Sequence, residues 1–260
     1  MKITRPDKNT KVTTFDSIQE LVNHTKTAEV TKTFKNSRTI LMSEKTEDRG
    51  TWYQTYDLDE AMTLLRNGWT DKSKELEKKL DIQLNKEAAP AIRQKSVYDV
   101  VGGNASVPRY LQGVPTNMIR QVRKPVKEKV VTVNYNISYN FTITGDQIIQ
   151  KAVDCLSYVK ALEDKGTRVN LKVYLVSREP YGGSKTFAYE VTVKKSSERL
   201  SISKLAFTLC HPSMLRRIMV SCIERDPEVT SEFVDGYGKP VRDLSDLKKI
   251  FPNTEFFNLS

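Results

Sequence analysis

The stretch that most constrains the fold of this chain runs from Val130 to Ser177. A run of β-branched residues, VVTVNYNISY, is followed by a long amphipathic segment and then by a second β-rich run, RVNLKVYLVS. A strand, a helix and a strand of these lengths are typical of a parallel crossover, in which the helix carries the chain back across the sheet. The pattern predicts a strand at 129–140, a helix near 145–164 and a strand at 168–177.

The segments after residue 178 extend this α/β pattern. An alternating stretch at 185–195 predicts a strand, and the lysines that flank it favour a place at the edge of the sheet. We therefore expect residues 129–260 to form a doubly wound, mostly parallel sheet with helices on its faces. Further strands are expected at 205–210, in SEFVDG and at 254–259, and further helices at 212–225 and 243–251.

The sequence of the N-terminal half predicts an α+β region that precedes the α/β domain. Residues 1–119 form this region, and a basic junction at 120–128 joins it to the domain at 129–260. Asp16 or Ser17 is expected to cap the first helix. Helices are expected at 14–25, 57–68 and 73–87, and short β-type runs occur at 38–42 and 51–56.

Residues 96–119 read SVYDVVGGNASVPRYLQGVPTNMI. Three glycines and two prolines in this stretch exclude a long regular element. The stretch is nevertheless rich in valine, tyrosine and leucine, and apolar irregular segments are usually packed. We therefore expect an ordered segment that wraps the body of the protein, with a strand at 97–101.

The chain is basic, with a net charge of +10 and a pI of about 9.3. Such a surplus suits contact with nucleic acid or another polyanion. Acidic residues interrupt the basic clusters, which instead favours a simple role in solubility. Both interpretations stay open, and Tyr110 is a candidate for stacking on a base. The candidate polyanion-binding residues are Arg109, Tyr110, Arg120, Arg123, Lys124, Lys127, Arg216 and Arg217.

Several classes of function find no support in the sequence. The three cysteines form no C-x-x-C pair, so we expect free thiols in a reducing compartment, two of them buried. We expect no secretory signal, because the first residues, MKITRPDKNTK, contain no apolar h-region. We also expect no membrane span, because no apolar run reaches about 18 residues. No phosphate loop or G-x-G-x-x-G motif is present, and His211 beside Ser213 fits helix capping or packing. We expect no cofactor and no enzymatic activity.

The order of elements in residues 129–260 resembles a von Willebrand factor A-type domain. That family places an Asp-x-Ser-x-Ser metal motif where this chain has Asn134, Asn136 and Ser138, and an Asp-Gly strand end where it has Asp235. The resemblance implies a site for Mg²⁺ at these residues. Asparagine brings no charge, and hard divalent ions favour carboxylates, so we expect Mg²⁺ binding to be weak or absent.

The whole chain is similar to an uncharacterised family of bacteriophage-encoded proteins. The resemblance rests on DLDEAMTLLRNGW, on SVYDVVGGNASVPRYLQGVPTNM and on HPSMLRR in the C-terminal half. It implies a phage or prophage product in the bacterial host cytoplasm or the virion. We expect a non-enzymatic protein that acts through contact with a phage or host protein. A nucleic-acid-binding protein and a metal-dependent enzyme are the alternatives.

Overall fold

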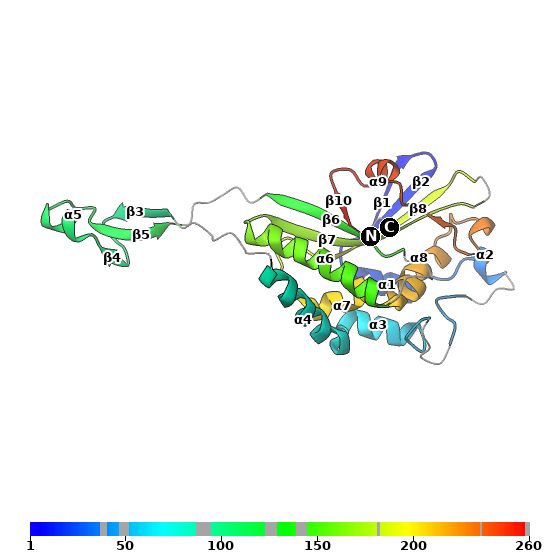
Figure 1. Ribbon diagram of the computed structural model, residues 1–260. Coiled ribbons are helices and arrows are strands. Elements are labelled where there is room, and N and C mark those ends of the chain that lie inside the picture. Colours follow the sequence, from blue (N-terminus) through cyan, green and yellow to red (C-terminus); the bar gives the residue numbers. More distant parts are fainter. Residues whose placement is uncertain are drawn as a thin grey trace.

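The computed structural model describes residues 1–36, 41–46, 52–86, 95–122, 129–138, 145–180, 183–234 and 236–257. Within them the chain forms a seven-stranded sheet in the order β1-β2-β8-β7-β6-β10, with β9 paired to β7, and a separate three-stranded sheet in the order β3-β5-β4 (Figure 1). The strands of the larger sheet are β1 (Lys2–Asp7), β2 (Thr10–Phe15), β6 (Val130–Asn136), β7 (Arg168–Arg178), β8 (Thr186–Lys194), β9 (Lys239–Pro240) and β10 (Glu255–Phe257). Those of the smaller sheet are β3 (Lys95–Asp99), β4 (Asn104–Ala105) and β5 (Met118–Val122).

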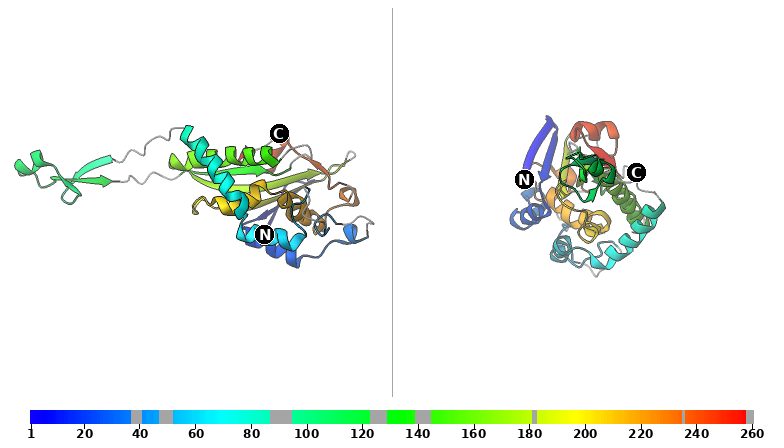
Figure 2. Two further views of the ribbon diagram at one scale, coloured as in Figure 1. Left: turned by 60° about the horizontal axis from the view of Figure 1, so that its bottom comes forward. Right: turned by 90° about the vertical axis from the view of Figure 1, so that its left-hand side faces the viewer.

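The helices flank the larger sheet on both faces (Figures 1 and 2). One face carries the main hydrophobic core under α1, α3, α4, α6 and α7, and the other carries a smaller core under α9. The fold is therefore mixed α/β. The helical segments are α1 (Ile18–Thr27), α2 (Lys32–Lys35), α3 (Leu58–Asn67), α4 (Thr70–Lys86), α5 (Val107–Leu111), α6 (Gly145–Asp164), α7 (Ile202–Cys210), the π-helix η1 (Met214–Met219), α8 (Val220–Glu224), the 3-10 helix η2 (Ser231–Phe233) and α9 (Leu244–Ile250).

The predicted crossover forms the centre of the sheet. β6 and β7 run parallel, in register from Val130 opposite Arg168 to Asn136 opposite Tyr174, and α6 connects them. β6 also runs parallel to β10 on its other side, so it is an internal strand, and β2 runs parallel to β8. The helix buries a stripe at i, i+4, i+7 and i+11, as an amphipathic helix on a sheet requires. That stripe is Ile148, Ala152, Cys155 and Val159.

The expected edge position of residues 185–195 is wrong. β8 pairs antiparallel with β7 and parallel with β2, which begins only ten residues into the chain. The lysines that suggested an edge have another role at Lys194, which is 2% exposed. Its ammonium group donates to Glu163 on α6 at 2.6 Å and to the carbonyl of Val169 at 3.2 Å. A buried, paired lysine and a protective edge lysine look alike in sequence.

Four short β segments expected from the sequence are also absent from the described residues. Residues 205–210 belong to α7, which is buried all along this stretch, and an apolar run without periodicity fits a buried helix as well as a strand. SEFVDG contains the 3-10 helix η2, which directs Phe233 into the core. Of the β-type runs expected at 38–42 and 51–56, residues 41–42 and 52–56 lie in turns and irregular backbone. Residues 38–40 and 51 lie outside the described residues.

The N-terminal helices begin close to the predicted residues. The Ser17 hydroxyl accepts from the amide of Glu20 at the start of α1, and Asp57 accepts from the amide of Glu60 at the start of α3. Residues 14 and 15, however, end β2 and do not begin the helix.

The hydrophobic core crosses the boundary that we expected at 120–128. It contains Phe15 and Leu65 from the first half and Leu156 and Phe207 from the second. α4 packs against α6 and α7, and β1 and β2 extend the sheet that β6 and β7 begin. The two halves therefore share one core.

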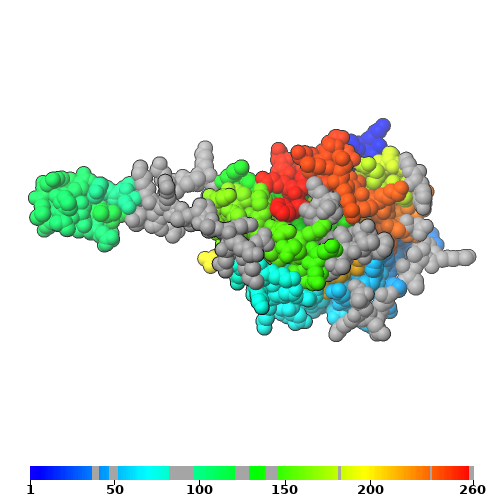
Figure 3. Space-filling view, in the orientation of Figure 1, coloured from blue at the N-terminus to red at the C-terminus, as the bar shows by residue number. Residues whose placement is uncertain are grey.

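Residues 96–119 do not wrap the body of the protein as we expected, because they belong to the smaller sheet and its helix α5. Figures 1 and 3 draw residues 95–122 away from the larger sheet, and we call this part of the chain the finger. Its main element contacts are those of β3 and β4 with β5. The stretches 87–94 and 123–128 that flank it lie outside the described residues.

Candidate functional site

The finger folds through local turn chemistry. β3 and β5 pair antiparallel, from Lys95 opposite Val122 to Asp99 opposite Met118. Gly102 follows β3 where a Cβ atom would clash with the backbone of Ile119, so the turn requires glycine. Proline is favoured in the first helical turn because it needs no amide hydrogen there, and α5 carries one. The glycines and prolines that exclude a long regular element thus build this compact unit.

The surface of the finger is unusually apolar. Twelve large hydrophobic side chains are exposed among the described residues, and six of them belong to these 28 positions. The exposed fraction reaches 77% for Leu111 and 70% for Val101. Single exposed apolar residues are ordinary, but a concentration of them marks an interaction site. The six are Tyr98, Val100, Val101, Val107, Tyr110 and Leu111.

Basic groups border this apolar surface. The Arg109 guanidinium lies over the ring of Tyr98, with its central carbon 4.1 Å from the ring centre. Arg120 forms an exposed ion pair with Asp99 at 3.3 Å. The finger contains three basic residues and one acidic residue, Lys95, Arg109 and Arg120 against Asp99, so its net charge is 3 − 1 = +2. With Arg120 paired to Asp99, the two positive charges that no acidic residue of the finger offsets are those of Lys95 and Arg109.

The candidate polyanion-binding residues separate into three groups. Arg109, Tyr110 and Arg120 lie together on the finger. Arg123, Lys124 and Lys127 lie outside the described residues. Arg216 and Arg217 lie on the π-helix η1, against the segment that contains Trp52 and Thr55.

The assignment of Arg217 to polyanion binding is wrong, because its side chain is fully buried. Its Nε donates to the Thr55 hydroxyl at 2.8 Å, and its two Nη atoms donate to four backbone carbonyls. The guanidinium carbon also lies 4.3 Å from the ring centre of Tyr53. All five donors of the guanidinium are used, so Arg217 holds the irregular segment onto η1. The four carbonyls belong to Ser43, Lys45, Thr55 and Tyr56.

Glu224 on α8 binds the same segment from a second side. Its carboxylate is fully buried and accepts from the Ser43 amide at 3.2 Å, from the Ser43 hydroxyl, and from the Tyr237 hydroxyl at 2.7 Å. Burial raises the pKa of this carboxyl group, because the charged form is poorly solvated, and the hydrogen bonds oppose that shift. Arg225 lies 3.6 Å from the carboxylate and 3.1 Å from Glu44. These contacts order the segment near η1 and α8.

Two of the residues expected at a metal site, Asn134 and Asn136, have other side-chain partners. Asn134 is fully buried, and its amide donates to Glu190 on β8 at 2.8 Å. The Asn136 side-chain oxygen accepts from the backbone amide of Ser138 at 2.9 Å. Asp235 lies outside the described residues. Among the residues that the structure describes, no group of three histidine, cysteine, aspartate or glutamate side chains has the spacing of a metal site.

Glu190 joins four strands in a buried polar row. Besides Asn134 on β6, it accepts from Lys172 on β7 at 2.7 Å and from the Thr14 hydroxyl on β2 at 3.3 Å. Buried charges are tolerated when they are paired and hydrogen-bonded. The arrangement accounts for Asn134 as a structural residue of the sheet.

His211 also has a structural role. It is buried between the rings of Phe207 and Trp69, and its Nδ1 accepts from the amide of Ser213 at 3.1 Å. Burial lowers the pKa of His211 to about 3, because the charged imidazolium is poorly solvated there. The Ser213 hydroxyl interacts with Thr55 and with the carbonyl of Tyr53. The pair is thus engaged in packing and capping.

Residues 3–256 match the family model described as Domain of unknown function (DUF7192). The chain belongs to this family. No curated protein and no solved structure matches it. The DUF7192 match begins within β1 and ends within β10, so it includes both the larger sheet and the finger. The finger is therefore part of the DUF7192 domain. No helix in the described parts of the chain has the length and apolar character needed to span a membrane.

Proposed function

We propose that this DUF7192 protein is a non-enzymatic binding protein whose finger contacts a partner protein. The observation that carries the proposal is the concentration of exposed valine, leucine and tyrosine side chains on residues 95–122. Aliphatic side chains gain free energy when another apolar surface covers them, and a fully buried leucine contributes roughly 1.5–3 kcal/mol. Tyrosine and arginine are, with tryptophan, the residues enriched where binding energy concentrates at protein interfaces.

Charge argues for an acidic partner and against a second copy of this chain. The chain carries +10 and the finger +2, so two copies meeting at this surface would bring like charges together. Juxtaposed like charges disfavour association, whereas opposite charges steer partners toward one another. The expected partner presents an apolar patch bordered by aspartate or glutamate side chains.

The origin of the partner follows from the sequence resemblance. DLDEAMTLLRNGW and the finger sequence SVYDVVGGNASVPRYLQGVPTNM are similar to bacteriophage-encoded proteins. This similarity supports a phage or prophage product, and a phage or host protein as partner, in the host cytoplasm or the virion. The β6–α6–β7 crossover followed by antiparallel β8 supports a likeness of residues 129–260 to von Willebrand factor A-type domains.

Nucleic-acid binding is the competing interpretation. Arg109, Tyr98 and Tyr110 favour it, because arginine contacts phosphate and tyrosine stacks on bases. The exposed Val100, Val101 and the valine and leucine of α5 offer little to bases or phosphates, so the balance favours a protein.

The test is a capture experiment with the full tagged chain in an extract of the bacterial host. We compare the natural chain with the double variant Val101→Ser/Leu111→Ser. The matched control is Ile3→Ser/Val130→Ser, which removes two exposed apolar side chains from the larger sheet. We expect a protein partner that the finger variant fails to retain and the control retains. With the purified partner, the finger variant should weaken binding by about 2–4 kcal/mol, which is roughly 30-fold to 1,000-fold in Kd.

Three outcomes would overturn the proposal. The first is that the finger variant and the control retain the same partners equally. The second is that nuclease treatment removes what is captured, and that Arg109→Gln/Arg120→Gln abolishes binding while the serine variant does not. The third is that the purified chain alone forms dimers that the finger variant prevents, as measured by sedimentation equilibrium.

A further inference from the structure

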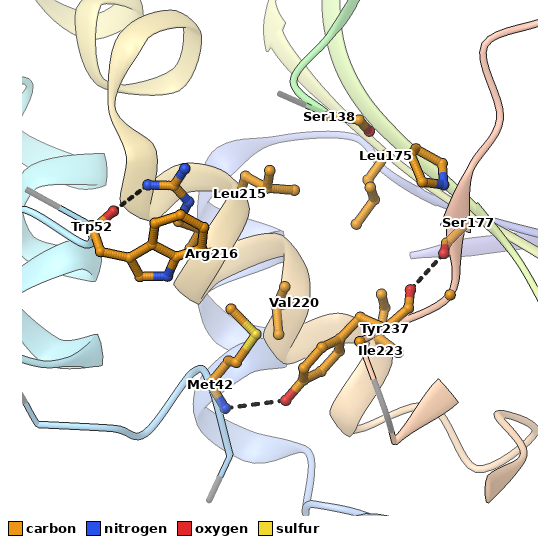
Figure 4. A pocket seen from close by; sticks show the side chains of 13 residues that line it. Met42, Trp52, Ser138, Leu175, Ser177, Leu215, Arg216, Val220, Ile223 and Tyr237 are labelled. Carbon is orange, nitrogen blue, oxygen red and sulfur yellow. Dashed lines mark hydrogen bonds between the residues drawn. The ribbon is translucent and has the colours of Figure 1, made fainter. Parts of the chain in front are cut away.

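A cavity of about 190 Å³ lies at the carboxyl ends of β6 and β7, outside the finger. Figure 4 shows it between η1 and α8 on one side and the strand ends with residues 236–240 on the other. Ligands of open α/β sheets commonly bind beyond the carboxyl ends of parallel strands. Leucine, valine and isoleucine side chains contribute four of the residues that line it. They are Leu175, Leu215, Val220 and Ile223.

One end of the cavity holds a cation that is fixed in place. The guanidinium carbon of Arg216 lies 3.6 Å from the ring centre of Trp52, and one Nη atom donates to the Trp52 carbonyl. Arg216 is partly buried, and burial lowers its pKa. It forms no ion pair with any acidic side chain in the described parts of the chain. A partly buried cation without a counter-ion is costly unless an anion pairs with it.

The other polar side chains that line the cavity are mostly engaged. The Ser177 hydroxyl donates to the Tyr237 carbonyl at 2.6 Å. The Tyr237 hydroxyl donates to Glu224 at 2.7 Å and accepts from the Met42 amide at 3.1 Å. The Ser138 hydroxyl has no hydrogen bond to the described residues. The groups left for a ligand are thus one guanidinium, one hydroxyl and an apolar wall.

We propose that this cavity binds a small organic carboxylate with an apolar body. The carboxylate pairs with Arg216, whose planar group suits its two oxygens, and the body covers Leu215 and Val220. The cavity volume of about 190 Å³ is many times the ~10–15 Å³ that a single water needs by this measure, so the space is large enough for a small organic molecule. A short aliphatic acid fits this size. The same chemistry occurs in a free carboxylic acid and in the C-terminal residue of a peptide with an apolar side chain.

Tryptophan fluorescence provides a local probe, because the chain has two tryptophans, Trp52 and Trp69. In Trp69→Phe the only tryptophan is the one beneath Arg216. Titration with hexanoate should give a saturable change in its emission, and hexanol and hexylamine should bind at least about tenfold more weakly, because they lack the charge that pairs with a guanidinium. Calorimetry on the natural chain repeats the titration without the substitution.

Two variants test the assigned contacts separately. Arg216→Gln should weaken hexanoate binding about tenfold or more, since a hydrogen bond to a charged group is lost. Leu215→Phe should fill the cavity and abolish binding with Arg216 intact, which keeps the test decisive if Arg216→Gln does not fold. Arg178→Gln is the matched control, because Arg178 pairs with Asp246 on the surface and does not line the cavity.

A peptide ending in leucine, with a free or an amidated C-terminus, distinguishes the two sources of the carboxylate. Tighter binding of the free-acid peptide than of hexanoate identifies a peptide end, and binding of hexanoate alone identifies a free acid. The proposal is overturned if hexanol binds as well as hexanoate, if neither variant changes the affinity, or if calorimetry detects no binding at millimolar hexanoate.

Discussion

Replacing Arg217 with lysine isolates the contribution of one buried guanidinium. The arginine uses five donors on the Thr55 hydroxyl and on the carbonyls of two short segments, 41–46 and 52–56. A lysine ammonium has three donors and a different shape, so at least two acceptors lose their partner. Each hydrogen bond to a charged group contributes about 1.5–3 kcal/mol to stability. We expect Arg217→Lys to lower the free energy of unfolding by about 3–5 kcal/mol.

Urea denaturation followed by circular dichroism measures this loss, provided that the slope of free energy against urea stays constant between variants. Arg216→Lys is the matched control. Arg216 is the neighbour of Arg217 in the sequence, but within the described residues its side chain makes only one hydrogen bond, to the Trp52 carbonyl, and it stacks on the half-exposed ring of Trp52. The control should cost no more than about 1 kcal/mol. Amide exchange at Thr55 and Tyr56 should accelerate in Arg217→Lys and not in the control. Equal stability of the two variants would refute the assignment of Arg217 as the residue that holds this segment.

Three further predictions concern other parts of the chain. All three cysteines are buried as free thiols, and burial raises their pKa values. A thiol reagent should therefore label none of them in the native protein and all of them in urea. Fast labelling of the native protein would contradict the packing of α6, α7 and α8. Burial lowers the pKa of His211 to about 3, whereas in the unfolded chain it is about 6.5. The contribution of this group to stability is therefore fully present above pH 6.5. Between pH 6.5 and pH 3 it falls by up to about 1.4 kcal/mol for each pH unit. Urea titrations between about pH 6.5 and pH 4 should show a shallower slope in His211→Phe, and an unchanged slope would exclude His211 as its source. In Gly102→Ala the new Cβ atom would clash with the backbone of Ile119. The variant should accelerate amide exchange in residues 95–122 and abolish partner capture, while exchange in β6 stays unchanged. Normal exchange in the finger would contradict this local role of Gly102.

The central crossover could be predicted because the residues that specify its strands and its helix lie close together in the sequence. The β-branched residues of β6 and β7 and the helical spacing of α6 lie within 50 consecutive residues, and each element carries its own pattern. The helix caps at Ser17 and Asp57 are equally local. Long-range pairing has no such pattern. Nothing in residues 10–15 indicates that they pair with residues 186–191, so β8 was assigned to an edge that β2 covers.

The candidate sites were only partly predictable for related reasons. Arg109, Tyr110 and Arg120 were identified by type, and they do lie together on the finger. Their surroundings were misjudged, because apolar content predicts burial within the chain and an interaction surface equally well. Arg217 is the opposite case. Its acceptors are backbone carbonyls of an irregular segment more than 160 residues away, which no sequence pattern reveals.

Hydroxyl-radical footprinting tests most directly whether a partner covers the exposed apolar side chains of the finger in the cell. The labelling of Tyr110 and Leu111 is compared between the purified chain and the chain in nuclease-treated host extract, with Val130 and Tyr56 as exposed references outside the finger. The account predicts that labelling of the two finger residues falls in the extract while the references stay unchanged. Equal labelling of Tyr110 and Leu111 in both samples would contradict it.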